Sequence, residues 1–334
     1  MIIDYEIIKN EYVKINACYD YSDIVKLPSD IDGFPVAELA AYAFSEKNTE
    51  AKNIRLWNSD KISIADGLPP RICGNKLREI VIPQSIKKIG RYAFYGCEEL
   101  RSLSMHSTTL DLGNGIFMGC GKLDELSITV DETSRSSLHE LLLMFCHKLK
   151  LHYYIADTNS GELKLKYLLI FPPYYENNDE NTPARITFRD LHGSGLYYRN
   201  CFANTAFKID KYDSLFAYAV ANEEENLSMS LALARLIFST GLNEADKEKY
   251  MSYVSENISS LTSSLQYFLN NDLCSLNDIR TLLFSSYINK EMISVIIEKS
   301  GELKAADILS LSMDIKKQRF SDNNASVRKR RFEL

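Results

Sequence analysis

Few side chains of this sequence stand at the spacings that metal binding requires. The chain has five histidines, His106, His139, His147, His152 and His192, and no two of them form an H-x-x-x-H pair. A helix-borne zinc site needs two histidines four residues apart with an acidic neighbour. We therefore expect the histidines to lie in loops and on the surface. Neither a metal nor another cofactor is expected.

Two glycine-containing segments could be mistaken for catalytic loops. Residues 193–195, Gly-Ser-Gly, lack the G-x-S-x-G frame of a nucleophile elbow and read as a turn. Residues 119–122, Gly-Cys-Gly-Lys, lack the first glycine and the Ser or Thr of a phosphate-binding loop. We therefore expect no enzymatic activity.

Each of two charged runs can be interpreted either as functional or as a solvated segment. Residues 223–225 are three glutamates, which suit a solvated connection before a helix N-terminus or a docking point. Residues 328–331, Arg-Lys-Arg-Arg, suit a solubilising tail, a contact to an acidic partner or a localisation signal. The net charge of −6 gives no reason to expect nucleic-acid binding.

A 23-residue repeat is the element that must position most of these side chains. Leu77, Ile80, Ile82, Phe94, Gly96 and Cys97 recur as Leu100, Leu103, Met105, Phe117, Gly119 and Cys120, and a third copy begins with Leu123, Leu126 and Ile128. A fixed period of this length predicts a solenoid of stacked supersecondary units. An earlier coil over residues 27–44 matches the same pattern at an offset of 50 residues.

Each coil has a simple physical logic. The residues at 80 and 82 point inward from a short strand, and Pro83 ends that strand because it has no N–H to donate. Ile86 and Ile89 cross the core as a second extended piece. Phe94 then returns to stack on Phe117, and Gly96 supplies a position of positive φ.

The segment Leu77 to Cys97, LREIVIPQSIKKIGRYAFYGC, resembles the BspA-type leucine-rich repeat family. The resemblance covers residues 24–149 and continues more weakly to about residue 210. It implies an α/β leucine-rich repeat solenoid and a protein-binding role. Such repeats also imply the alternative function, a surface-associated, adhesin-like binder of host protein or glycan.

The composition and the apolar spacing change after Asp213, which predicts a second domain. Residues 214–318 contain two glycines and no proline, with apolar residues three and four apart, which indicates helices. We expect a solenoid with an N-terminal cap over residues 1–212, an ankyrin-like helical domain over 213–320 and a flexible basic tail over 321–334. Residues 174–183 are expected to form a polar loop, residues 186–207 a last degenerate coil, and the first helix a cap on that coil.

The outward side of the strand stack is the candidate binding surface. By strand alternation it carries small and polar groups, namely Asn53, Arg55, Glu79, Val81, Ser102, Ser104, Glu125 and Ser127. These residues and the helical domain predict a non-enzymatic scaffold for protein–protein interaction. The alternative is that they are merely solvated strand residues.

Composition sets the remaining expectations. Seven cysteines without a C-x-x-C pair predict free thiols, and Cys97, Cys120 and Cys146 occupy equivalent repeat positions. No apolar run is long enough to span a membrane, and the N-terminus lacks the features of a signal peptide. We expect a cytoplasmic monomer that binds a protein partner, neither nucleic acid nor membrane, unless an export signal has been removed.

Overall fold

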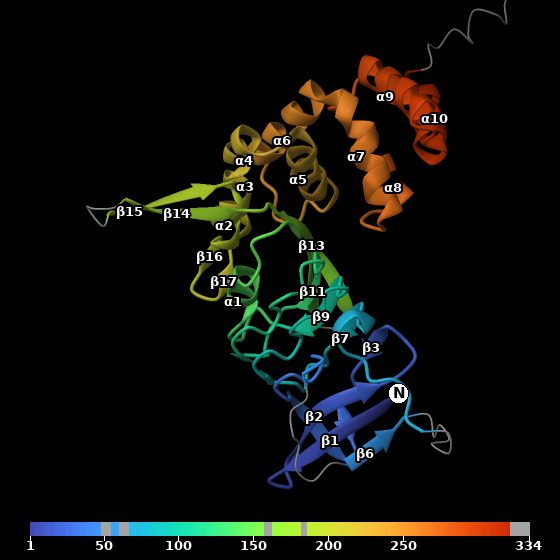
Figure 1. The fold of residues 1–334 in the computed structure, drawn as a ribbon. Coiled ribbons are helices and arrows are strands. Elements are labelled where there is room, and N and C mark those ends of the chain that lie inside the picture. Colours follow the sequence, from blue (N-terminus) through green and yellow to red (C-terminus); the bar gives the residue numbers. More distant parts are fainter. Residues whose placement is uncertain (48–54, 60–66, 157–161, 182–185, 321–334) are drawn as a thin grey trace, which may run out of the picture. The chain divides into compact units, whose positions relative to one another are not determined.

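The computed structural model describes residues 1–47, 55–59, 67–156, 162–181 and 186–320 (Figure 1). The chain forms two compact units, Met1–Lys211 and Tyr212–Leu334, which we call the repeat unit and the helical unit. The basic tail of residues 321–334, with its Arg-Lys-Arg-Arg run, lies outside the described residues.

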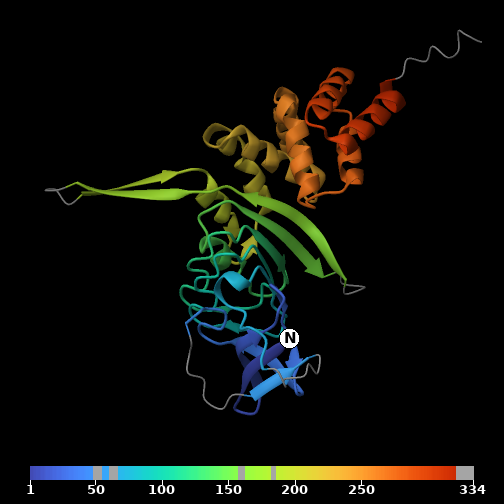
Figure 2. The ribbon, with the colours of Figure 1, turned by 45° about the vertical axis from the view of Figure 1, so that its right-hand side comes forward.

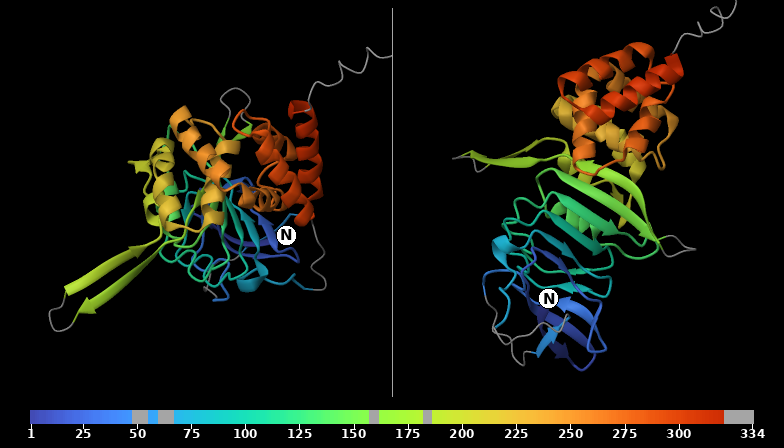
Figure 3. Two further views of the ribbon diagram at one scale, coloured as in Figure 1. Left: turned by 90° about the horizontal axis from the view of Figure 1, so that it is seen from above. Right: turned by 90° about the vertical axis from the view of Figure 1, so that its right-hand side faces the viewer.

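Two sheets form the walls of the repeat unit, and the strands of the repeat coils within them are two to six residues long, as expected of a solenoid. The first sheet has the order β10 (Asp111–Leu112), β8 (Lys88–Ile89), β5 (Phe34–Leu39), β2 (Tyr12–Tyr19), β1 (Ile2–Ile8) and β6 (Arg55–Asn58), and β4 (Asp30–Ile31) also pairs with β5. The second has the order β13 (Leu163–Phe171), β12 (Leu149–Ala156), β11 (Glu125–Thr129), β9 (Ser102–His106), β7 (Glu79–Val81) and β3 (Ile24–Lys26). Figure 3 (right) shows strands of the repeat unit lying one above another.

The predicted 23-residue period is confirmed by the strand register. In the second sheet Ile80 pairs with Leu103 and Leu103 pairs with Leu126, all in parallel. In the first sheet Leu39 pairs with Ile89, which confirms the offset of 50 residues between the first coil and the next. The inward residues of these strands are fully buried, so the core lies between the two walls.

A column of phenylalanine rings runs along the core. Phe44 and Phe94 stack with centroids 5.2 Å apart, and Phe94 and Phe117 stack at 5.4 Å with an interplanar angle of 2°. Phe145 continues the column at 5.2 Å from Phe117. No coil could bury such a ring alone, and the stack does so collectively.

The turns between the coils need left-handed backbone. Gly96 and Gly119 have φ of 74° and 88°, as expected for equivalent glycines. Gly115 also has a positive φ of 65°, and a Cβ there would lie 2.4 Å from the Tyr92 ring. The repeat therefore fixes backbone conformation as well as apolar spacing.

The repeat cysteines, Cys97 and Cys120, are buried and donate to carbonyl oxygens of the preceding coil. The Cys97 thiol reaches Phe44 O at 3.3 Å, and the Cys120 thiol reaches Phe94 O at 3.1 Å. Burial raises the pKa of Cys120 to about 12 and raises the pKa of Cys97 further. Cys146 is exposed, so its predicted equivalence to the repeat cysteines is wrong.

The N-terminal segment is a hairpin, in which β1 pairs with β2 in antiparallel fashion. Its second strand joins the first coil through the pairing of β2 with β5. This hairpin therefore covers the open end of the first wall.

The segment after the third coil departs from the repeat. Helix α1 (Leu138–Leu143) replaces the second extended piece, and β12 then pairs with β13 in antiparallel fashion. The predicted loop at 174–183 and the predicted coil at 186–207 are both wrong. Strands β14 (Tyr175–Asn181) and β15 (Ile186–His192) form a hairpin that extends from the strand stack (Figure 2). Helix α2 (Gly195–Arg199) and the small hairpin of β16 (Phe202–Ala203) and β17 (Ala206–Phe207) follow.

Buried Arg199 holds these irregular segments together. One guanidinium nitrogen donates to Pro172 O at 2.6 Å and to Gly195 O at 3.0 Å, and the other donates to His147 O at 2.5 Å. A Cβ at residue 195 would lie 2.2 Å from Pro172 O. The Gly-Ser-Gly segment therefore serves close packing.

The helical unit follows the sequence pattern closely. Its helices are α4 (Phe216–Asn222), α5 (Glu225–Ile237), α6 (Glu244–Glu256), α7 (Ile258–Asn270), α8 (Leu276–Leu283), α9 (Lys290–Glu302) and α10 (Ala306–Phe320), preceded by α3 (Ile209–Ser214). Helix α5 contacts α4, α6, α7 and α8, and α9 contacts α7 and α10. The side chains of Asn243 and Ser275 cap α6 and α8 by accepting from the backbone N–H three residues on.

A buried ion pair lies in the core of the helical unit. Arg235 Nε donates to Asp213 Oδ1 at 2.7 Å, and a second guanidinium nitrogen donates to Asp213 Oδ2 at 3.0 Å. The Tyr250 hydroxyl donates to the same carboxylate at 2.9 Å. This network fixes the positions of three helices relative to one another.

Candidate functional site

The outward residues of β7, β9 and β11 form two straight rows across the second sheet. Glu79, Ser102 and Glu125 are paired neighbours in one row, and Val81, Ser104 and Ser127 are paired neighbours in the other. The residues between them along each strand are buried. The structure thus brings six of the eight predicted residues onto one surface, which we call the strand face.

The other two predicted residues do not belong to the strand face. Asn53 lies outside the described residues. Arg55 begins β6, which pairs with β1 at the edge of the first sheet, so its alignment with the strand face is wrong. The neighbouring strand position is filled by β3, where Ile24 pairs with Glu79 and Lys26 with Val81.

Strand β12 extends the strand face beyond β11. Lys150 pairs with Glu125 and His152 with Ser127 in the register of the strands. The Lys150 ammonium lies 3.4 Å from the Glu125 carboxylate, and His152 Nε2 lies 3.6 Å from the same carboxylate. Glu125 is therefore paired with Lys150, while burial lowers the pKa of the neighbouring His152.

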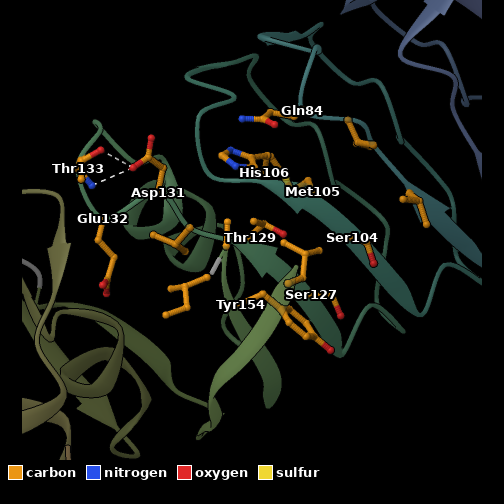
Figure 4. A pocket seen from close by; sticks show the side chains of 16 residues that line it. Gln84, Ser104, Met105, His106, Ser127, Thr129, Asp131, Glu132, Thr133 and Tyr154 are labelled. Carbon is orange, nitrogen blue, oxygen red and sulfur yellow. Dashed lines mark hydrogen bonds between the residues drawn. The ribbon is translucent and has the colours of Figure 1, made fainter. Parts of the chain in front are cut away.

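At the carboxyl ends of these strands the strand face opens into a cavity of about 830 Å³ (Figure 4). Its walls come from the strand ends and from the loops that follow β7 and β11. The lining includes Gln84, Ser104, His106, Ser127, Thr129, Asp131, Thr133 and Tyr154, with apolar Val81 and Leu163. We call this cavity the groove.

A rigid acidic turn closes one end of the groove. Asp131 accepts from the Thr133 backbone N–H at 2.9 Å, from the Thr133 hydroxyl at 2.6 Å and from the Ser134 hydroxyl at 2.6 Å. These hydrogen bonds lower the pKa of Asp131 to about 2, so the group is a carboxylate at neutral pH. Glu132 beside it pairs with Lys166 at 2.7 Å and accepts from Tyr153 at 3.1 Å.

His106 lines the groove in its neutral form. Its Nδ1 lies 2.9 Å from the Thr108 hydroxyl and accepts from the Thr108 backbone N–H at 3.3 Å. Burial, and after it the charge of Lys87, lower the pKa of His106. The imidazole Nε2 then carries the proton and serves as a donor.

The groove is suited to recognition by hydrogen bonds. Serine and threonine hydroxyls both donate and accept, the Gln84 amide does the same, and Tyr154 adds a ring and a hydroxyl. Over the described ranges no three His, Cys, Asp or Glu side chains converge in a way that could hold a metal ion.

Sequence reasoning missed the residues of the groove that follow the strands. His106 and Thr129 stand two positions beyond Ser104 and Ser127, so the same alternation predicts them once the strands are known to be five residues long. Asp131 and Thr133 could be read as a turn signal. Leu27-Pro28 matches Ile82-Pro83 in the repeat. The sequence could therefore have assigned the residues before this pair, Ile24 and Lys26, to a strand of the strand face.

Comparison with family models gives a match to the "BspA type Leucine rich repeat region", in 6 copies over residues 72–157. Residues 72–157 therefore match the BspA-type repeat, as the sequence resemblance indicated. Repeats of this class support a general role as a binding scaffold. The match does not extend to the helical unit, so an ankyrin-like arrangement there stays a prediction.

Three solved structures are similar to part of the chain. A leucine-rich repeat protein of T. pallidum shares 22% identity over 38% of this chain and 50% of its own, with a TM-score of 0.27. One from Bacteroides capillosus shares 20% identity over 39% of this chain and 83% of its own, with a TM-score of 0.27. A leucine-rich cell surface protein of Faecalibacterium prausnitzii shares 17% identity over 38% and 31%, with a TM-score of 0.26.

The aligned part spans about half the length of the T. pallidum protein. A comparison with curated proteins gives no match. Within the described part of the chain, no helix has the length and apolar character needed to cross a membrane.

Proposed function

We propose that the chain is a non-enzymatic scaffold that binds a protein partner on the strand face, with the groove as the specific part of the surface. The observation that carries this proposal is the continuity of the two: the row of Val81, Ser104 and Ser127 leads directly into the groove that these residues also line. The BspA-type repeat match supports the general binding role.

The side chains of the strand face favour close approach of a polypeptide. The serines are small, and parallel pairing fixes their spacing at about 4.8 Å from strand to strand. A partner can therefore bring its backbone near the sheet and meet a regular series of hydroxyls. Val81, 37% exposed, adds an apolar contact in the same row.

The charges of the strand face and the groove favour a partner that offers hydrogen-bond donors and a basic side chain. Strands β7, β9 and β11 contain no lysine or arginine, although Lys26 and Lys150 stand on the flanking strands. Glu132 is paired with Lys166, so Asp131 is the carboxylate that a partner would meet at the end of the groove. A basic residue of the partner directed to this end would meet a carboxylate that stays ionised down to low pH. Complementary charge of this kind contributes to specificity and to the association rate.

The helical unit is proposed as a second binding surface. Phe284, Leu303 and Met313 are between 44% and 56% exposed there. A contiguous exposed apolar patch marks a candidate contact site for other proteins, and these side chains are the first to test for one on the helical unit.

The test is comparative capture with the full chain. Wild type, Ser104→Arg/Ser127→Arg and the control Gly121→Arg are immobilised, and proteins retained from the source organism are quantified by mass spectrometry. A Cβ at residue 121 meets nothing within 4 Å, so the control adds the same side chain away from the strand face. We expect a protein that wild type and Gly121→Arg retain and the double variant loses.

Two outcomes would contradict the proposal. Equal retention by all three proteins would place the binding surface elsewhere. The adhesin-like alternative would be favoured if a glycan binds wild type and not the double variant, and no protein shows this difference.

A further inference from the structure

A second cavity, of about 500 Å³, lies at the turns between the coils, away from the strand face. Its lining includes Tyr95, Glu46, Glu98 and Met118. Both glutamates are exposed. We call this cavity the turn site.

The chain's own Lys47 shows which chemistry the turn site accepts. Its ammonium lies over the Tyr95 ring, 4.9 Å from the centroid, and 5.9 Å from the centroid of Tyr42. A cation over a tyrosine face is attracted by the negative potential of the ring. One ammonium does not balance two carboxylates, so the site keeps a net negative charge.

The Tyr95 ring of the turn site is supported by Tyr42 and Tyr92, two tyrosines with left-handed backbone. Tyr42 and Tyr92 have φ of 60° and 55°, while the equivalent third position is Gly115. Glycine takes this conformation without strain, and a bulky residue does not. The two tyrosine rings stack at 5.3 Å, and the Tyr95 ring meets Tyr92 edge-on at 5.8 Å. Tyr42 and Tyr92 are half-buried and do not line the turn site themselves, but their stacked pair supports the Tyr95 ring, which does.

We propose that the turn site binds a primary ammonium group, the side chain of a lysine of a protein partner, and that Lys47 is an internal occupant which this lysine displaces. The carboxylates favour a primary over a quaternary ammonium, because only the former donates hydrogen bonds to them. Lys47 is exposed and flexible, so it can leave the ring. The turn site is separate from the strand face, and its test does not depend on the function proposed for that face.

The experiment uses the full chain with ¹³C-methyl methionine. Met118 lines the turn site and is 59% exposed, so its methyl resonance reports occupancy, and Met118→Leu assigns it among the eight methionines. The probe is Nα-acetyl-lysine methylamide, which keeps the side-chain ammonium. Matched controls are N-acetyl-norleucine methylamide, which lacks the ammonium, and choline, which carries a quaternary one.

We expect the lysine probe to shift the Met118 resonance saturably, and with a lower Kd in Lys47→Ala than in wild type, because the internal competitor is gone. Adding Tyr95→Leu to Lys47→Ala should raise the Kd by about two- to fivefold, the loss of one cation–π contact of ~0.5–1 kcal/mol. Glu98→Gln should also raise the Kd, and added salt should weaken binding. The other methionine resonances show that each variant is folded.

The proposal is overturned if the lysine probe leaves the Met118 resonance of Lys47→Ala unchanged. It is also overturned if the norleucine probe acts equally, or if Tyr95→Leu has no effect on the Kd. Binding of choline without binding of the lysine probe would assign the turn site to a quaternary ammonium and reject the lysine side chain.

Discussion

Phe94→Ala tests the stacked core of the repeat unit most severely. Phe94 is fully buried and lies between two parallel rings, Phe44 at 5.2 Å and Phe117 at 5.4 Å. Truncation removes an inner ring of the column. The rings on either side then face a void that the rigid coils cannot close, because each coil is held by strand pairing to its neighbours.

The magnitude follows from burial. A buried aromatic side chain withdraws at least ~150 Å² from water, which at ~25 cal/mol per Å² amounts to about 4 kcal/mol. Measured truncations of buried phenylalanine cost about 3–5 kcal/mol, and two lost ring pairs place this site in the upper part of that range. For a unit of this size, 4 kcal/mol lowers the melting temperature by roughly 8–16 °C.

The assay is thermal and urea unfolding followed by far-ultraviolet circular dichroism. Tyr21→Ala serves as the control, since Tyr21 is 84% exposed and its truncation should change the unfolding free energy by less than about 0.5 kcal/mol. A Phe94→Ala protein that melts within about 2 °C of wild type would refute the reasoning. Residue 94 would then be outside the core, and the coil register would be wrong.

Three further perturbations probe other parts of the chain. Gly115→Ala should destabilise the repeat unit by more than ~1 kcal/mol in urea unfolding, because of its positive φ and the Tyr92 ring, whereas Gly121→Ala should be close to neutral. Arg235→Met should cost about 3–5 kcal/mol by leaving Asp213 buried without its cation, and an added Asp213→Leu should recover part of that loss in the same unfolding assay. Iodoacetamide at pH 8 should alkylate exposed Cys146 and spare the repeat cysteines, whose pKa is raised, as peptide mass spectrometry would show; equal labelling would contradict the buried coil turns.

The repeat could be predicted from the sequence because several constraints recur together. Ile80, Phe94 and Gly96 satisfy burial, ring stacking and positive φ in one coil, and the same set returns 23 residues on. Coincidence does not produce this combination. The helices were predictable for a similar reason, since caps such as Ser275 agree with the apolar spacing that follows them.

Strands that depend on a distant partner could not be predicted. The segment of β14, YENNDEN, has low β propensity and reads as a loop, and it is a strand only because β15 pairs with it. The placement of Arg55 failed differently. Four alternating residues suit a strand in either sheet, and only the pairing of β6 with β1 decides which sheet holds them.

The candidate site was predictable where strand alternation decides it. Ser104 and Ser127 follow from the repeat alone, and the structure places them side by side. The groove was not predictable, because Asp131 and Gln84 belong to loops, and loop positions follow from tertiary packing. The turn site depends on Lys47 reaching a ring of the next coil, far along the sequence, which no local pattern contains.

Photocrosslinking in the source cells tests the central claim most directly. A photoreactive phenylalanine analogue is placed at residue 104, at residue 127 or at the control residue 121, and the adducts are identified by mass spectrometry. Because Ser104 and Ser127 are paired neighbours on the strand face, we predict the same protein adduct from both positions and none from position 121. Unrelated adducts from the two serine positions, or an equal adduct from position 121, would contradict the assignment of the strand face as the binding surface.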